Sequence, residues 1–276
     1  MGLSNGIGGD FAPEWDGTLL RNTHLAAWEG YLANNLYEKV FFDPNFQALY
    51  EQGLNLQGIR EKDRKYFKDP DEGLAAHLAL AHMHYADFGD DHELFKLFWE
   101  KGTIKQHSSF VIFIGRVFIS GKNPKLDELL KKKPMIKKRI KKLWEWLLEN
   151  YSNPELFRYF GLWISLENNI FELKWLANKV QKTLIKTEGD LDWGRGLIKS
   201  MIKFAYNAPE DTLIIIRSYL LGVKTKRKLR MFYLEQDWID AFRILYKNYP
   251  EKTRRLISDL IEIGGQVFWR LKNVLE

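Results

Sequence analysis

Apolar side chains recur along most of this chain with the spacing of an amphipathic α-helix. The pattern is clearest after Pro134, a residue that suits the first turn of a helix because its missing N–H group needs no partner there. The apolar residues that follow return to one side with a period of 3.6 residues, and lysines occupy the other side. These apolar positions are Ile136, Ile140, Leu143, Trp144, Leu147, Leu148 and Tyr151. They predict a helix with one buried stripe.

Short breaks separate this helix from further helical segments. Proline cannot continue a helix but can begin the next one, so Ser152–Pro154 predicts a turn before a helix that contains residues 157–164. Asn168 and Asn169 mark another break before residues 171–184. In the rest of the chain, similar signals predict helices over about 24–36, 44–53, 74–88, 93–101, 110–120, 193–207, 212–221, 238–249, 250–263 and 266–275.

Helix caps and loops can also be predicted. Asp90 or Asp91 is the expected N-cap of the helix over 93–101, and Ser108 or Ser109 that of the helix over 110–120. Residues 60–73 predict a loop or a short helix, and residues 224–230 predict a basic loop.

The spacing of the helices indicates how they are arranged. From Pro134 onwards, successive helix starts are about 13–28 residues apart, and helices joined by short turns lie antiparallel. This regular spacing of helix starts predicts an all-α fold of stacked antiparallel helix pairs, which is a HEAT-like solenoid array. An irregular helical bundle is the alternative. Strand-like runs at 110–114 and 213–216 lie inside longer helical patterns, and we find no repeat consensus at the level of single residues.

Charge divides the chain into two parts. Residues 1–120 carry 11 Lys and Arg against 17 Asp and Glu, whereas residues 121–276 carry 31 against 19, so the net charges are −6 and +12. We therefore predict a flexible lead-in at 1–20, an acidic helical subdomain at 21–121 and a basic helical-repeat subdomain at 122–276. Such asymmetry favours a surface that meets an acidic partner or that associates with a second copy.

Composition limits the class of protein further. An apolar fraction of 45% and ten Trp residues supply a core for 276 residues. No apolar run approaches the roughly 18–20 residues that span a bilayer, and the first ten residues lack the features of a signal peptide. The absence of cysteine excludes disulfides and thiolate sites and favours a reducing compartment. We expect a soluble cytoplasmic protein with no membrane segment.

Two basic stretches are the main candidates for contact with a partner. The first has eight cations within twelve residues and the second has five within seven. Either stretch can neutralise phosphates or face an acidic protein, although a solvated helix face and a solvated loop are the simpler interpretation. Trp144 and Trp146 lie nearby, but Trp144 belongs to the apolar stripe, which argues against base stacking. The candidate residues are Lys131, Lys132, Lys133, Lys137, Lys138, Arg139, Lys141, Lys142, Lys224, Lys226, Arg227, Lys228 and Arg230.

A group of histidines and aspartates is the densest set of potential metal ligands. On one continuous helix, four of its members would share a face, and a metal site needs three or four ligands that converge. The spacing does not match His-Glu-x-x-His, so a polar helix face that ends in a cap is the simpler interpretation, and a metal-dependent enzyme is an alternative. The group consists of His77, His82, His84, Asp87, Asp90, Asp91 and His92, of which His77, His84, Asp87 and Asp91 would share the face.

The remaining chemistry gives little sign of catalysis. Gly6–Gly9 lacks the Lys and Ser or Thr of a phosphate-binding loop. Paired carboxylates, Asp190 with Asp192 and Glu210 with Asp211, precede helices, where capping is their usual role. We therefore expect no enzymatic activity and no cofactor.

Five segments carry apolar helical patterns, at residues 27–32, 157–165, 171–176, 238–245 and 256–268. They resemble the C-terminal helical regions of large bacterial multidomain proteins, which include sirtuin-like and STAND-type ATPase proteins associated with anti-phage defence. The resemblance implies a HEAT-like, non-enzymatic region that serves sensing or assembly, with an effector domain elsewhere. It carries no catalytic residue to this chain, which lacks a nucleotide-binding motif. We expect a helical scaffold or sensor that binds a macromolecular partner, most simply a protein.

Overall fold

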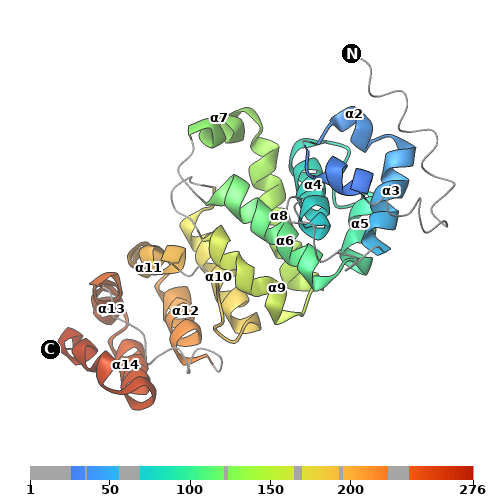
Figure 1. Cartoon of the computed structure of the whole chain (residues 1–276). Helices are drawn as coiled ribbons and strands as arrows, with labels where there is room; N and C mark the ends of the chain where they lie inside the picture. Colours follow the sequence, from blue (N-terminus) through green and yellow to red (C-terminus); the bar gives the residue numbers. More distant parts are fainter. Residues whose placement is uncertain are drawn as a thin grey trace. The chain divides into compact units, whose positions relative to one another are not determined.

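The computed structural model is all-α in the parts of the chain that it describes (Figure 1). These parts are residues 26–34, 36–55, 69–120, 124–164, 170–192, 195–222 and 236–275. The predicted fold class is therefore confirmed, and no helix in these ranges is long and apolar enough to cross a bilayer. The predicted lead-in at 1–20 lies outside the described residues.

The chain forms two compact units, Met1–Phe113 and Ile114–Glu276. The boundary that we infer from charge, between residues 121 and 122, stays a prediction. In the first unit, short helices surround a core of fully buried aromatic side chains, including Phe41, Tyr50 and Phe95. The elements are a helical segment at residues 26–32, α2 (Glu38–Phe41), α3 (Pro44–Asn55), α4 (Pro70–His84), α5 (Glu93–Lys101) and most of α6 (Ile104–Ile114).

Some helix boundaries in the first unit differ from those predicted. The helix α4 begins at Pro70, four residues earlier than expected, because the carboxylate of Asp69 accepts the Asp71 N–H at 3.1 Å. The predicted caps Asp90 and Asp91 were wrong, because Nδ1 of His92 accepts the first-turn N–H of Leu94 at 3.2 Å. The predicted caps Ser108 and Ser109 were also wrong, since α6 begins at Ile104 and both serines lie inside it.

The second unit matches the predicted helices more closely. The helix α8 begins at Pro134, and Ile136, Ile140, Leu143, Trp144 and Leu147 of the predicted stripe are buried. The elements are η1, a π-helical turn (Gly115–Ile119), α7 (Pro124–Lys132), α8 (Pro134–Asn150), α9 (Pro154–Arg158), η2 (Tyr159–Trp163), α10 (Leu173–Lys186), α11 (Arg195–Asn207), α12 (Pro209–Leu221), α13 (Gln236–Asn248), α14 (Pro250–Gly264) and η5 (Gly265–Val274).

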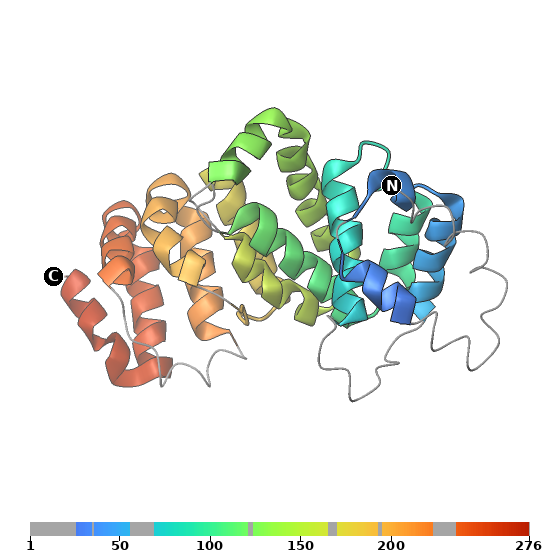
Figure 2. The same ribbon diagram turned by 45° about the horizontal axis from the view of Figure 1, so that its top comes forward.

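These helices stack in two layers. Layer A consists of α8, α10, α12 and α14, and each of these helices packs on the next member of the layer. Layer B consists of η2, α11, α13 and η5, which pack in the same way, and contacts such as those between α13 and α14 join the layers. Figure 1 shows α11 beside α13, and Figure 2 shows the stack from a second direction. This alternation is typical of helix-pair repeats.

A residue-level repeat accompanies the stack, contrary to our interpretation of the sequence. The ends of α11 and α13 share Asn-x-Pro-Glu-x-Thr, with Pro209 and Pro250 placed 41 positions apart. In both copies the Asn side chain donates to the carbonyl four residues earlier, and the proline begins the next layer A helix. The matched residues are Asn207 and Asn248, Glu210 and Glu251, and the buried Thr212 and Thr253. Because residues between these positions vary, periodicity alone did not reveal the repeat.

Candidate functional site

The first basic stretch lies at the junction of α7 and α8 and along α8. Lys131, Lys132, Lys133 and Lys138 are exposed, and within the described ranges no carboxylate forms an ion pair with them. Lys142 is also exposed. The described part of this stretch therefore exposes five lysines to solvent, and their role in contact with a partner stays a prediction. The second basic stretch, Lys224, Lys226, Arg227, Lys228 and Arg230, lies outside the described residues.

Other cations of the first stretch are half-buried and help to hold α8 in place. Lys141 forms an ion pair with Glu172, the residue before α10, and its Nζ lies 5.3 Å from the centre of the Trp175 ring. The hydrogen bond from Lys141 lowers the pKa of the Glu172 carboxyl below its usual value. Lys137 and Arg139 are also half-buried. The stretch therefore divides into exposed lysines and a set with a structural role.

Tryptophan side chains join α8 to α10. The Nε1 of Trp175 donates to the Glu145 carboxylate at 2.9 Å, and Lys179 Nζ lies 2.9 Å from the same carboxylate. The hydrogen bond from Lys179 is the main cause of the lowered pKa of Glu145. Deeper between the helices, the fully buried Trp144 donates from Nε1 to the Thr183 hydroxyl at 3.1 Å. Trp144 therefore belongs to the core and is not available to stack on a base.

Ion pairs continue across layer A. Glu210 of α12 lies 3.0 Å from Lys252 of α14, and Arg217 of α12 lies 2.6 Å from Asp259 of α14. Asp211 faces α10, where burial raises its pKa against the opposing effects of Lys174 and a hydrogen bond from Asn178. Opposite charges thus connect neighbouring helices along this layer.

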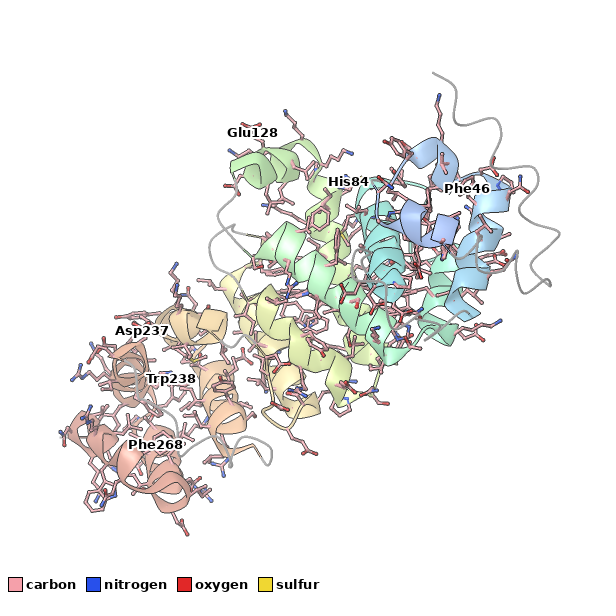
Figure 3. All side chains as sticks on the ribbon, viewed as in Figure 1. Phe46, His84, Glu128, Asp237, Trp238 and Phe268 are labelled. Carbon is pink, nitrogen blue, oxygen red and sulfur yellow. The ribbon has the colours of Figure 1, made fainter. Side chains whose placement is uncertain are left out.

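Charge in layer B is arranged differently. By sequence, α11, α13 and η5 carry seven Lys and Arg residues against two Asp. In their described parts, the ion pair Arg243–Asp240 lies within α13, while Lys199, Lys203, Lys247 and Arg270 have no carboxylate partner among the described residues. Trp238 of α13 and Phe268 of η5 are fully buried and attach this layer to the core (Figure 3).

Exposed aromatic rings accompany these cations. Tyr206 of α11 is 69% exposed and Trp269 of η5 is 55% exposed, which is unusual for side chains of this size. Sequence reasoning missed this surface because its residues are spread over three helices. The one local signal was the spacing of Lys199, Lys203 and Tyr206, which places them on one face of α11.

The histidines and aspartates around α4 do not form one helix face. The helix α4 ends at His84 (Figure 3), so Asp87 and Asp91 follow it and cannot extend its face as predicted. His77 is buried, with Nδ1 2.7 Å from the Tyr50 hydroxyl and Nε2 2.9 Å from the Asn34 carbonyl. Because a carbonyl only accepts, Nε2 carries the proton and Nδ1 accepts from Tyr50.

Two further histidines of the group have structural roles in the first unit. His82 is fully buried and stacks on Phe95 at 4.5 Å, with Nε2 3.7 Å from Asp90. His92 caps α5. In the part of the chain that the structure describes, no three His, Asp or Glu side chains are placed to hold a metal ion.

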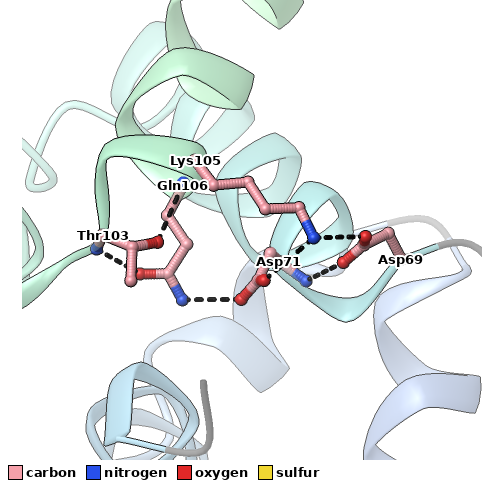
Figure 4. Close-up of polar contacts among 5 residues, drawn as sticks. All are labelled: Asp69, Asp71, Thr103, Lys105 and Gln106. Carbon is pink, nitrogen blue, oxygen red and sulfur yellow. Dashed lines mark hydrogen bonds and ion pairs between the residues drawn. The ribbon is translucent and has the colours of Figure 1, made fainter. Parts of the chain in front are cut away.

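A polar network ties the start of α4 to the start of α6 (Figure 4). Lys105 Nζ lies 2.5 Å from Asp69 and 3.3 Å from Asp71, and these carboxylates raise the pKa of the lysine. The buried Gln106 donates to Asp71 at 2.9 Å and accepts the Thr103 N–H at 2.9 Å. Each carboxylate therefore has a partner within the fold, and the network holds two helix starts together.

The paired carboxylates after α10 also have a structural role. Arg158 of α9 contacts Asp190 and Asp192, each at 3.1 Å, and its carbonyl accepts the Asp192 N–H at 2.9 Å. The backbones approach so closely that a Cβ atom on Gly161 would lie 1.7 Å from the Asp192 carbonyl oxygen. Both carboxylates therefore hold α9 beside the end of α10, and their predicted capping role stays a prediction.

Comparison with known proteins gives no relative for this chain. No family model matches it, and no curated protein or solved structure does so. The resemblance to helical regions of bacterial defence proteins therefore stays a prediction.

Proposed function

We propose that this chain is a non-enzymatic helical scaffold that binds a partner protein with an acidic surface. The observation that supports this function is the stack of layers A and B, because stacked helix pairs present a continuous face built from successive helices. The exposed Lys131, Lys132, Lys133 and Lys138 supply positive charge that steers an acidic partner and favours its docking.

Capture from a lysate of the native host tests the proposal. The full chain and the variant Lys131→Glu/Lys132→Glu/Lys133→Glu are immobilised in parallel, after nuclease treatment of the lysate. We expect the unchanged chain to retain a protein that the variant loses and that added salt releases. The single variant Lys182→Glu, on an exposed position of α10, controls for charge reversal elsewhere.

Two outcomes would count against this function. Equal retention by the unchanged chain and the triple variant would remove these lysines from the contact. Material that is retained only when the nuclease is omitted would favour our alternative, in which Lys131–Lys142 and Lys224–Arg230 bind nucleic acid.

A further inference from the structure

The outer face of layer B combines positive charge with exposed aromatic rings. Its cations Lys199, Lys203, Lys247 and Arg270 have no carboxylate partner among the described residues, whereas layer A carries ion pairs between its helices. It also exposes the rings of Tyr206 and Trp269. Charge alone suits any polyanion, but exposed rings add a preference for a ligand with flat, stackable groups.

The repeat relates the exposed faces of α11 and α13. Shifting the sequence of α11 by 41 positions aligns it with α13, so that Tyr206 corresponds to Lys247, and both are exposed. On α11, Lys199, Lys203 and Tyr206 lie at i, i+4 and i+7 and form one row. On η5, Lys272 Nζ lies 4.2 Å from the centre of the Trp269 ring, which adds positive charge beside the second aromatic side chain.

The spacing of the helices fits a short strand of nucleic acid. The helix α13 packs on both α11 and η5, and packed helices lie about 8–10 Å apart. The span from α11 to η5 is therefore roughly 16–20 Å, which about five to six nucleotides cover at about 3.4 Å each. Bases in a duplex are already stacked on their neighbours, so only an unpaired strand offers free faces to both rings.

From these observations we infer that the outer face of α11, α13 and η5 binds single-stranded nucleic acid. The cations contact successive phosphates, and Tyr206 and Trp269 stack on bases. This surface lies on different helices from the lysines of α7 and α8 and goes beyond the scaffold function proposed above.

Binding of a labelled twelve-nucleotide thymidine strand to the full chain, followed by fluorescence anisotropy at rising salt, tests this inference. We expect Lys199→Ala/Lys203→Ala to reduce the slope of log affinity against log salt by about 1.4, since each lost phosphate contact on a single strand contributes about 0.7. Tyr206→Ala and Trp269→Ala should each weaken binding at least about fivefold, whereas Tyr206→Phe and Trp269→Phe should retain it. Lys182→Ala/Arg255→Ala, at exposed positions of α10 and α14, is the charge-matched control and should change neither quantity.

Three results would overturn the inference. The first is a duplex of the same length that binds as tightly as the single strand. The second is binding that is insensitive to loss of either ring and is competed equally by poly-glutamate, which would indicate an acidic protein as the ligand. The third is an equal loss in the control on α10 and α14, which would indicate general attraction between charges. Circular dichroism of each variant confirms that it is folded before these results are compared.

Discussion

The two units of this chain place their ionisable groups in opposite ways. All six histidines precede residue 108, and in the first unit His77, His82 and His107 are buried among aromatic rings. The second unit contains no histidine and carries ion pairs between solvent-accessible side chains, such as Arg217–Asp259 and Lys252–Glu210. A buried imidazole makes stability depend on pH, whereas surface ion pairs make it depend weakly on salt. The stability of the first unit should therefore depend on pH, and that of the second unit should depend weakly on salt.

The helix α5 shows how histidines hold the first unit together. At its start, Nδ1 of His92 accepts the Leu94 N–H, so this nitrogen must be unprotonated. At its end, Nε2 of the buried His107 lies 2.8 Å from the Phe98 carbonyl and donates to it. Burial lowers the pKa of both imidazoles, outweighing the raising effect of Glu93 on His92 and of the Phe98 carbonyl on His107.

The largest effect is expected for removal of Trp144 from the core of the second unit. Trp144→Ala removes a fully buried ring and leaves the Thr183 hydroxyl without its donor, so the free energy of unfolding should fall by about 3–5 kcal/mol. Urea unfolding followed by circular dichroism measures it. Trp269→Ala, which removes an exposed ring, should change stability by less than about 0.5 kcal/mol. Similar losses in the two variants would show that burial does not distinguish these tryptophans.

The hydroxyl group of Thr183 provides the next largest effect. Thr183→Val keeps the shape of the side chain but leaves the buried Nε1 of Trp144 without an acceptor, which should cost about 1–3 kcal/mol. Thr183→Ser retains the hydroxyl and serves as the control. If valine proved as stable as threonine in the same urea experiment, the hydrogen bond between α8 and α10 would have no net stabilising role.

A smaller loss of stability is expected in the first unit when the pH falls. Because the pKa values of His92 and His107 lie below the ordinary value of 6.5 in the folded chain, the unfolded chain takes up protons first. The stability of α5 should therefore be complete above about pH 6.5 and decline below it. Hydrogen exchange of the α5 amides at pH 7.5 and 5.5 measures this change.

A variant of His92 distinguishes the effect of this helix cap on stability from the effect of the other histidines. In His92→Asp the carboxylate can accept the same first-turn N–H and remains ionised at pH 5.5, so the loss of protection at the start of α5 should shrink. A contrary result is also defined. If the α5 amides of the unchanged chain were equally protected at both pH values, and the amides of α8 or α10 lost protection at pH 5.5, the second unit would be the pH-dependent one.

The contrast between the units also explains what the sequence could predict. The helix α8 was predicted to within one residue because Pro134 and one apolar stripe define it locally. The start of α4 was missed because Asp69 lies beside a charged segment that resembles a loop. Lys141 appeared to be one of several surface cations, yet its partner Glu172 lies 31 residues away. The layer B surface was missed for the same reason: periodicity identifies which face of a helix is exposed, but only packing shows which exposed faces adjoin.

The smallest effect concerns the ion pairs that distinguish layer A from layer B. Arg217 is 56% exposed, so water screens its 2.6 Å contact with Asp259 despite the short distance. A double-mutant cycle with Arg217→Ala and Asp259→Ala should give a coupling energy below about 1 kcal/mol that declines in 1 M salt, where the screening length is about 3 Å. The pair Arg243–Asp240 lies within one helix and should couple by only about 0.2–0.5 kcal/mol. If both cycles gave zero, the ion pairs of layer A would not stabilise the stack, and buried contacts such as Trp144–Thr183 would account for the joining of its helices.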